Sequence, residues 1–450
     1  MTDTATPLTT PADGLPALTN TPAALAKAVA KLAAASGPVA ADTERASGFT
    51  YAARAQLVQL YRRGAGLVLI DAAALPDLTS LSQALRGAEW VLHAASQDLP
   101  SLRACGIEPD RIFDTELASR LLGLKQVGLA AVVARTLGLA LAKEHSAQNW
   151  SRRPLPEAWL NYAALDVAVL LDVRDVLEAE LQEAGKLDIA RAEADNVLHA
   201  SPPTPRPDPW RRTTGAHTLK DSRRLAVLRS MWQARDRLAA KRDVFPGRVL
   251  PDAALVAAAS AMPSSSADLR AIAPFNGRNQ SRLLSYWWAA LAEGLATPRA
   301  DLPPLRGPVT HLVPAVRQWQ RCNPAAAERM TQVKAALAAL SETWDIPVEN
   351  LARPDLVRQV VFQAPADIPA VLAANGARDW QIKAVGPILE AALADQPSEF
   401  DVPPSGVPGG GLDEMHGGPS DEVSSASSGA VPEEGADGIP GGVPSKEPDA

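Results

Sequence analysis

The stretch Pro38-Val39-Ala40-Ala41-Asp42-Thr43-Glu44 ends a short apolar run with two carboxylates. Side chains two residues apart on a β-strand point to the same face, so Asp42 and Glu44 should converge at the carboxyl end of this strand. Two like charges held in this way repel each other unless a cation lies between them. The pair alone also fits an ordinary solvated strand end, and the rest of the chain has to decide between the two interpretations.

Three residues later in the sequence, Asp98, Tyr162 and Asp166, have side chains that could form a site together with Asp42 and Glu44. Asp98 falls in the first turn of a predicted helix, where an Asp is also a common helix cap. Tyr162 and Asp166 are four residues apart, a spacing that places both on one face of a helix. The alternative is an incidental pair on the protein surface, which would have the same spacing. The alanines around them leave room for a ligand.

Together the four carboxylates form an oxygen-only donor set, which favours Mg²⁺ or Mn²⁺ over zinc. Two such ions can activate a water and stabilise the departing oxygen of a phosphodiester. We expect Asp42 to contact both ions. Glu44 and Asp166 would complete the coordination of the first ion, and Asp98 would bind the second ion directly or through a water. Tyr162 would orient the attacking water, since a phenol with a pKa near 10 is a poor general base at neutral pH.

The segments around these residues predict an α/β domain. Residues 21–36 predict a helix with Thr21 as N-cap and Pro22 as its first residue. Three strands joined by short polar links predict an antiparallel meander, and the helices and strands that follow extend it to a mixed sheet flanked by helices. The predicted strands are Val39–Glu44, Gln56–Arg62, Leu67–Asp71, Trp90–His93 and Ile112–Asp114, and the predicted helices are 77–86, Ser96–Cys105, 115–123, 126–138 and 156–183.

Proline content and an internal echo define the other domains. His199–Pro209 contains five prolines in eleven residues and predicts a stiff linker. After it, the run Asp243-Val-Phe-Pro is echoed by Asp345-Ile-Pro, which predicts two related all-helical domains. Beyond residue 394 too few apolar residues remain to form a core. We expect a disordered lead (1–20), an α/β domain (21–198), the linker (199–209), two helical domains (210–296 and 303–394) and a disordered acidic tail (395–450).

The charge is distributed unevenly over the 450 residues. The net charge is −7, but the tail holds 12 of the 51 Asp and Glu residues, whereas residues 210–250 hold 11 Lys and Arg against three Asp. This predicts a local basic surface and a separate acidic segment, whose partner the composition does not identify.

Two distant cysteines, Cys105 and Cys322, predict neither a disulfide framework nor a zinc site, and they favour the reducing cytoplasm. The N-terminus lacks a secretory signal pattern, and no apolar run reaches membrane-spanning length, so no membrane partner is expected.

The motif residues and their surroundings resemble a known family. The set Asp42-x-Glu44, Asp98 and Tyr162-x-x-x-Asp166 is similar to the three motifs of the DEDDy branch of DnaQ-like 3′–5′ exonucleases. Segments 210–296 and, more weakly, 303–394 resemble the helicase-and-RNase-D C-terminal (HRDC) domain. Three runs resemble the bacterial ribonuclease D family in particular, namely Val91-Leu-His-Ala-Ala-Ser-Gln-Asp98-Leu, Phe113-Asp-Thr with Leu121-Leu-Gly123, and Asn149-Trp-Ser-Arg-Arg-Pro154-Leu.

This resemblance implies a ribonuclease H-like exonuclease domain followed by two HRDC-like domains. It implies hydrolysis of phosphodiester bonds from RNA 3′ ends, tRNA precursors among them, by the five motif residues with two Mg²⁺ or Mn²⁺ ions. Three positions depart from the family pattern: Arg45 stands in place of Phe, Gln97 in place of an acid and Asn149 in place of Asp. None is a proposed metal ligand, so these departures concern substrate preference more than catalysis.

Several further residues have both a functional and a structural interpretation. His93 ends a strand, where a buried, hydrogen-bonded histidine is the alternative to a substrate contact. Asp114 could support the site or cap the next helix. Trp150, Arg152 and Arg153 could meet a base and phosphates, although a Trp packed under the following helix fits equally well.

In the basic segment, Arg211 and Arg212 are predicted RNA-backbone contacts, and plain solvent exposure is the alternative. Two other functions stay open, a DNA-directed 3′–5′ exonuclease in repair and a catalytically silent RNA-binding scaffold. No polymerase or helicase pattern accompanies the motifs, which counts against the first. A silent scaffold should have lost at least one of the four carboxylates, and all four are present.

Removing residues 395–450 should leave the melting temperature of the rest of the chain unchanged, because this segment lacks the apolar residues that a core requires. Differential scanning calorimetry of the full chain and of a chain ending at residue 394 measures the effect. A lower melting temperature of the shortened chain would contradict our interpretation of the tail.

Overall fold

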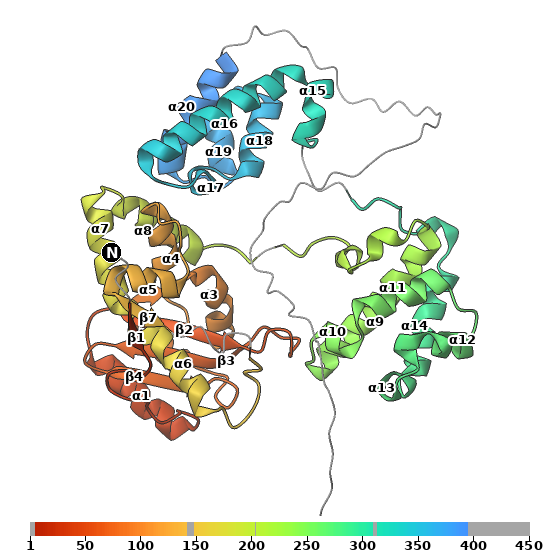
Figure 1. Ribbon diagram of the computed structural model, residues 1–450, viewed down its shortest axis with the longest axis horizontal. Helices are drawn as coiled ribbons and strands as arrows, with labels where there is room; N and C mark the ends of the chain where they lie inside the picture. Colours follow the sequence, from red (N-terminus) through yellow and green to blue (C-terminus); the bar gives the residue numbers. More distant parts are fainter. Residues whose placement is uncertain (1–4, 142–147, 203, 309–312, 395–450) are drawn as a thin grey trace, which may run out of the picture. The chain divides into compact units, whose positions relative to one another are not determined.

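The computed structural model describes residues 5–141, 148–202, 204–308 and 313–394. A five-stranded mixed sheet forms the centre of the first domain (Figure 1). Its order is β4-β3-β2-β5-β6, with β2, β3 and β4 antiparallel and β2, β5 and β6 parallel, so the predicted meander and the α/β class are confirmed. The strands are β2 (Val39–Arg45), β3 (Ala55–Arg62), β4 (Gly66–Asp71), β5 (Glu89–Leu92) and β6 (Arg111–Asp114).

Helices cover both faces of this sheet. On one face, α6 packs over β2, β3 and β4, and its alanines join Ala40, Leu57 and Leu69 in one core. On the other face, α1, α2 and α3 pack against Val39 and Val58 in a second core. The helices are α1 (Pro22–Ala34), α2 (Thr79–Ala84), α3 (Ala95–Ala104), α4 (Thr115–Leu121), α5 (Leu129–Leu137), α6 (Glu157–Ala168), α7 (Leu170–Glu183) and α8 (Leu187–Leu198). As predicted, the Thr21 hydroxyl caps α1 by accepting the Ala24 N–H.

Two expectations about this domain were wrong. The lead was expected to be disordered, yet β1 (Thr6–Leu8) pairs in parallel with β7 (Leu139–Leu141), and Thr19 bridges to β4 through two backbone hydrogen bonds of 2.8 and 2.9 Å. Backbone pairing therefore orders a segment whose side chains gave no strand signal. The single helix predicted over 156–183 is two helices that meet at Val169, and α8 was not predicted.

The two C-terminal helical domains share one layout, each by itself. A 21-residue helix, α9 (Ser222–Arg242) or α16 (Pro324–Trp344), ends at an Asp in the left-handed conformation, Asp243 (φ 47°) or Asp345 (φ 48°). A short helix and a ten-residue helix follow in both, namely α10 (Pro246–Val249) with α11 (Asp252–Ala261), and α17 (Val348–Leu351) with α18 (Pro354–Gln363). This shared layout supports the relation that the echoed run predicts.

The remaining elements of the two domains are η1 (Pro209–Arg212), η2 (Ala216–Thr218), α12 (Ser266–Ala271), η3 (Ala273–Phe275), α13 (Arg278–Ser281), α14 (Leu284–Ala296), η4 (Arg299–Asp301), η5 (Val316–Gln318), α15 (Trp319–Cys322), α19 (Ile368–Ala374) and α20 (Asp379–Ala394). The described residues of the predicted linker form neither helix nor strand before Pro209. The predicted acidic tail lies outside the described residues. Within them, no helix has the length and apolarity that a bilayer crossing requires.

One buried carboxylate fixes the turns at the carboxyl end of the sheet. Asp114 ends β6, and Ala94, which leads into α3, adopts the left-handed conformation (φ 59°). The Asp114 carboxylate accepts four backbone N–H groups at 2.8 to 3.2 Å, those of Ala94, Ala95, Glu116 and Leu117. The interpretation as a helix cap is therefore confirmed for α4, and the same carboxylate also holds the start of α3.

Replacing Asp114 by Ala should destabilise the α/β domain by about 2–4 kcal/mol, because several buried N–H groups would lose their acceptor. Thr21→Ala is the matched control, since it removes an exposed cap from a helix of the same domain and should cost only about 1 kcal/mol. Calorimetric unfolding of the two variants measures the difference. Equal losses would contradict the role that we assign to Asp114.

Candidate active site

Three carboxylates from two elements meet at the carboxyl end of β2. One oxygen from each of Asp42, Glu44 and Asp166 lies within 4.8 Å of the others. Asp42 and Glu44 share the face of β2 that α6 covers, and α6 carries Asp166. The predicted convergence of the first two carboxylates is therefore observed, and the third joins them across the contact between the strand and the helix.

Asp98 approaches from the other face of the sheet. It lies in the first turn of α3, is 4% exposed, and its Oδ1 accepts a 2.7 Å hydrogen bond from the Thr43 hydroxyl. Thr43 lies between the two carboxylates of β2, but its side chain points to the opposite face, where α3 packs. Asp98 is thus beside the three-carboxylate group without being part of it. The sequence did not predict the role of Thr43. Its partner, Asp98, is 55 residues away in the chain, and no local sequence pattern indicates such a contact.

Burial and mutual repulsion make these carboxyl groups hard to ionise. Burial raises the pKa of Asp42 well above its ordinary value, and the charges of Asp98, Asp166 and Glu44 raise it further. Burial together with Asp166 and Asp98 raises the pKa of Glu44 to about 9. Burial also raises the pKa of Asp98 to about 6 and that of Asp166 to about 7. Such a cluster is suited to bind a divalent cation, because the ion replaces the protons and removes the repulsion.

Tyr162 completes the predicted set. It is one turn before Asp166 on α6, and its hydroxyl donates a hydrogen bond to that carboxylate. Burial and the neighbouring carboxylates raise the pKa of the Tyr162 hydroxyl, so it keeps its proton at neutral pH. The side chain can therefore donate and accept hydrogen bonds, and it is unsuited to act as a base.

Arg45, one of the departures from the family pattern, directly follows Glu44 in β2. Its Nη1 donates a 2.8 Å hydrogen bond to the carbonyl of Gln97, the residue before Asp98. The charge of Arg45 also lowers the pKa of both Glu44 and Asp98, against the larger effect of their burial. This guanidinium therefore offsets part of the negative charge at the entrance to α3.

The loop before α6 is anchored to the sheet by Arg153. Its Nε and Nη2 bind both carboxylate oxygens of Asp71, at 2.8 and 2.6 Å, and Nη2 also donates to the carbonyl of Gln56. Burial opposes ionisation of Asp71, but the hydrogen bonds from Arg153 and the backbone hold its pKa below the ordinary value. Trp150 is completely buried, with its ring 5.4 Å from that of Trp159, so the loop uses it for packing.

The remaining predicted substrate contacts lie in different settings. His93 Nδ1 is 2.9 Å from the Thr115 hydroxyl, and burial lowers the pKa of this imidazole to about 4, which fits the structural interpretation. Arg152 and Arg212 are exposed. Arg211 stacks its guanidinium 4.3 Å from the Trp210 ring centroid. These positions leave Arg152 and Arg212 as the accessible candidates.

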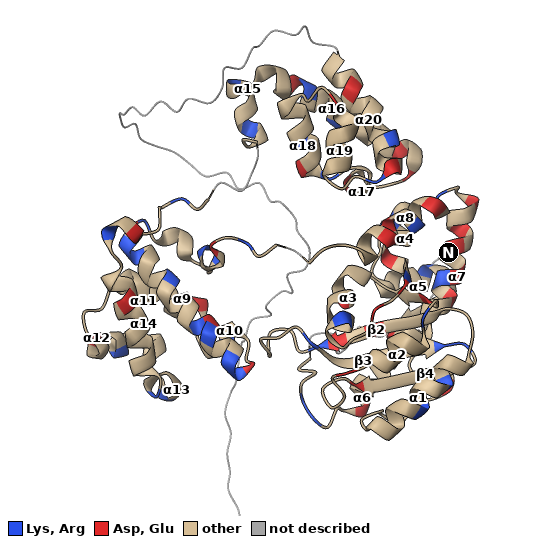
Figure 2. Ribbon diagram, turned by 180° about the vertical axis from the view of Figure 1, so that it is seen from behind, with Lys and Arg blue, Asp and Glu red and all other residues tan. Residues whose placement is uncertain are grey.

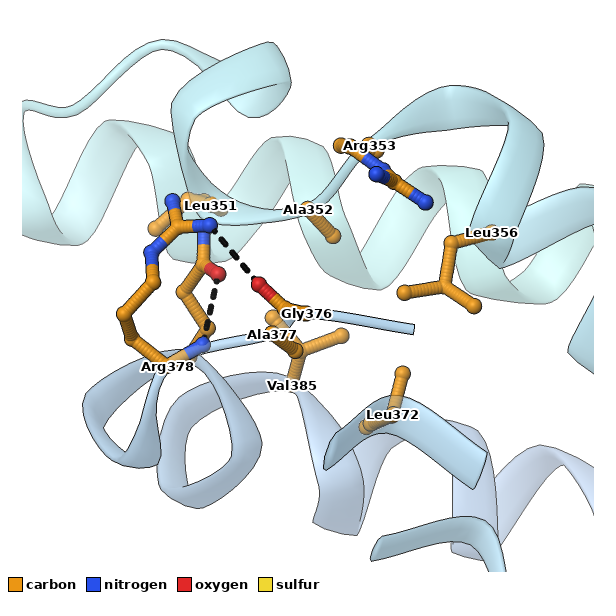
Figure 3. Close-up of a pocket in the computed structure, with 10 residues that line it drawn as sticks. Leu351, Ala352, Arg353, Leu356, Leu372, Gly376, Ala377, Arg378 and Val385 are labelled. Carbon is orange, nitrogen blue, oxygen red and sulfur yellow. Dashed lines mark hydrogen bonds between the residues drawn. The ribbon is translucent and has the colours of Figure 1, made fainter. Parts of the chain in front are cut away.

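A hollow in the last helical domain has a different character (Figure 3). The side chains of Leu356, Leu372 and Val385 line it, and Arg378 closes one side by donating to the Gly376 carbonyl at 3.1 Å. None of the five motif residues contributes to it. The hollow therefore offers no counterpart to the carboxylate cluster of the first domain.

Three separate parts of the chain match known families. Residues 17–182 match a 3′–5′ exonuclease family, residues 224–291 match the HRDC domain, and residues 312–393 match a family described as 3′ to 5′ exonuclease C-terminal domain. The fold and the site thus define the chain as a 3′–5′ exonuclease.

Ribonuclease D of Gluconacetobacter diazotrophicus is 32% identical over 338 residues, which cover 74% of this chain and 82% of that protein. The crystal structure of Escherichia coli RNase D is similar with a TM-score of 0.62 and 26% identity, covering 85% and 99% of the two chains. A Bifidobacterium adolescentis protein aligns with a TM-score of 0.81 and 35% identity, covering 87% and 100%. The chain belongs to the ribonuclease D family, and it is a 3′–5′ exoribonuclease.

In EDTA, the stability of the α/β domain should fall as the pH rises from about 4 to about 9. The unfolded carboxyls release their protons near pH 4, whereas the folded groups keep theirs up to pKa values of about 6, 7 and 9. The folded state therefore binds more protons over this range, and each increase in pH favours unfolding.

Asp166→Asn should flatten this pH dependence, because it removes one of the groups and lessens the repulsion on the others. The exposed Glu157, on the same helix, provides the control variant Glu157→Gln, which should follow the wild-type curve. Melting temperatures at pH 5, 7 and 9 decide the matter. An Asp166→Asn curve parallel to that of the wild type would refute the expectation.

Proposed function

We propose that the chain trims the 3′ ends of structured RNA, tRNA precursors among them, by hydrolysis that depends on two Mg²⁺ or Mn²⁺ ions. The observation that carries this proposal is the group of three carboxylate oxygens within 4.8 Å, with Asp98 held beside it. Carboxylate oxygen is the donor that these hard ions prefer. The two free cysteines, one buried and one exposed, accord with action in the cytoplasm.

The chain's own residues would divide the work as follows. Asp42 would contact both ions, Glu44 and Asp166 would hold the first, and Asp98 would hold the second directly or through a water. When bound, the ions would supply a more acidic water and neutralise the charge that develops on the departing oxygen. The Tyr162 hydroxyl, placed by its hydrogen bond to Asp166, would orient that water toward the phosphorus atom.

The first helical domain has a surface suited to the RNA backbone. Lys and Arg cluster on α9 and α10 (Figure 2), and five of them are exposed, namely Arg224, Arg237, Lys241, Arg242 and Arg248. By contrast, Arg235 is buried and binds the Asp252 carboxylate at 2.6 Å, so it serves the fold. Contacts of exposed cations with phosphates give affinity without reading sequence.

Two considerations favour RNA with secondary structure as the substrate. The similar Escherichia coli enzyme is described as an exoribonuclease involved in structured RNA processing. In addition, the exonuclease domain of this chain is followed by two helical domains that can hold the body of an RNA while its end is trimmed. We expect two exposed side chains to contact phosphates, namely Arg152 in the loop before α6 and Arg212 at the start of the first helical domain.

Purified protein should shorten a 3′-extended tRNA in Mg²⁺ or Mn²⁺ and release 5′-nucleotides, and EDTA should stop the reaction. Asp42→Ala should lower the rate by at least about 10³-fold, equivalent to about 4 kcal/mol of lost transition-state stabilisation. Tyr162→Phe should lower it by about 10²-fold, because the water would be bound but poorly oriented. Gel analysis of end-labelled RNA measures all three rates.

Glu157→Ala is the control for these variants, because it removes an exposed carboxylate from the helix that carries Tyr162 and Asp166. Its rate should match that of the wild type. Matched single-stranded DNA tests the substrate class, and faster degradation of DNA than of RNA would overturn the proposed substrate. Full activity of the Asp42→Ala variant would overturn the assignment of the site.

A further inference from the structure

Gln59 is a completely buried amide directly beside Asp42. It lies in the middle of β3 and is paired with Asp42 across the antiparallel β2–β3 ladder. Paired residues of such a ladder project to the same face, so the Gln59 side chain lies on the face that α6 covers. Within the described part of the chain, neither its Nε2 nor its Oε1 has a hydrogen-bond partner.

The buried Gln59 amide destabilises the fold unless it forms a hydrogen bond. A buried polar group without a hydrogen bond costs about 1–3 kcal/mol, and most such groups in folded proteins are paired. Within the sheet, the neighbours of Gln59 on this face other than Asp42 are Leu57 and Tyr61 along β3 and Leu69 on β4. The leucines offer no polar atom, and Tyr61 lines a separate cavity together with Lys31. Asp42 is the neighbour in register that carries an acceptor.

We propose that Gln59 is a positioning residue for Asp42: when the ions are bound, the Gln59 amide N–H donates to the Asp42 carboxylate and fixes the orientation in which Asp42 contacts them. This inference rests on the proposed ion-dependent function. An amide bound to a fully charged carboxylate forms a stronger hydrogen bond than one bound to a neutral group. Residues that orient a ligating carboxylate in this way contribute to ion affinity without touching the ion.

The alternative is a purely structural role, in which Gln59 binds an enclosed water whether or not ions are present. The two roles differ in the state of the protein that they stabilise. A positioning role predicts that losing the amide harms the ion-loaded protein alone. A structural role predicts the same harm with and without ions.

Gln59→Met in the full chain separates these roles, since Met has a similar volume and shape but no hydrogen-bonding amide. In EDTA the melting temperature of this variant should equal or exceed that of the wild type, because two unpaired polar atoms are removed. In a Mn²⁺ titration, the concentration that gives half of the thermal stabilisation should rise about 10- to 100-fold. Leu69→Met, at the buried position next to Gln59, should leave both quantities unchanged.

Asp42→Asn serves as the reference for loss of an ion ligand and should abolish most of the Mn²⁺ stabilisation. If the wild type itself gains no stability from Mn²⁺, the ion-dependent function fails and this inference fails with it. If the wild type responds, Asp42→Asn does not, and Gln59→Met matches the wild type, then only the role of Gln59 is refuted. A Gln59→Met protein that unfolds or loses stability in EDTA would equally refute it, because the amide would then have a partner without ions.

Discussion

Repulsion among closely spaced, partly or fully buried carboxylates is the constraint on which the rest of this structure depends. Asp42, Glu44 and Asp166 place oxygens within 4.8 Å of one another, in a setting where burial further opposes their ionisation. Left to themselves, such groups would move apart or draw in solvent. They stay together because Asp42 and Glu44 belong to a strand that is paired with β3 along its length, and because Asp166 belongs to a helix that packs over three strands. Stability gained in the two cores thus offsets instability at the site, an arrangement common at functional sites.

Polar contacts outside the carboxylate group hold the two segments that lead into α3 and α6. Arg153 binds Asp71 and thereby ties the loop before α6 to the end of β4. Asp114 holds the turn into α3, the helix that delivers Asp98, and Thr43 binds the Asp98 carboxylate itself. The alternation of β2 makes this possible, since one strand sends carboxylates to α6 and a hydroxyl to α3. The strand therefore coordinates helices on both faces of the sheet, so that four carboxylates from three elements gather at its end.

Local spacing predicted the parts of this site that local geometry determines. The two-residue spacing of Asp42 and Glu44 and the four-residue spacing of Tyr162 and Asp166 each fix a shared face, and the structure places them accordingly. The position of Arg153 in a polar loop predicted a phosphate contact, but in the structure its guanidinium binds the Asp71 carboxylate at the end of β4. The sequence also did not predict that residues 5–20 are structured, because their structure depends on backbone pairing with distant strands. What the sequence conceals in each case is the register between segments far apart in the chain.

Affinity and turnover should respond to different ions in this protein, for an electrostatic reason. At the proposed site of hydrolysis, four ionised carboxylates would repel a polyanion, so this site would attract RNA only once divalent ions offset its charge. The exposed Lys and Arg of α9 and α10 have the opposite sign and need no ion to attract phosphates. If both proposals hold, monovalent salt screens the second interaction and acts on binding, whereas divalent ions act on the first and on hydrolysis. Separating the two proposed functions into different domains would allow the proposed catalytic centre to remain acidic in an enzyme whose substrate is a nucleic acid.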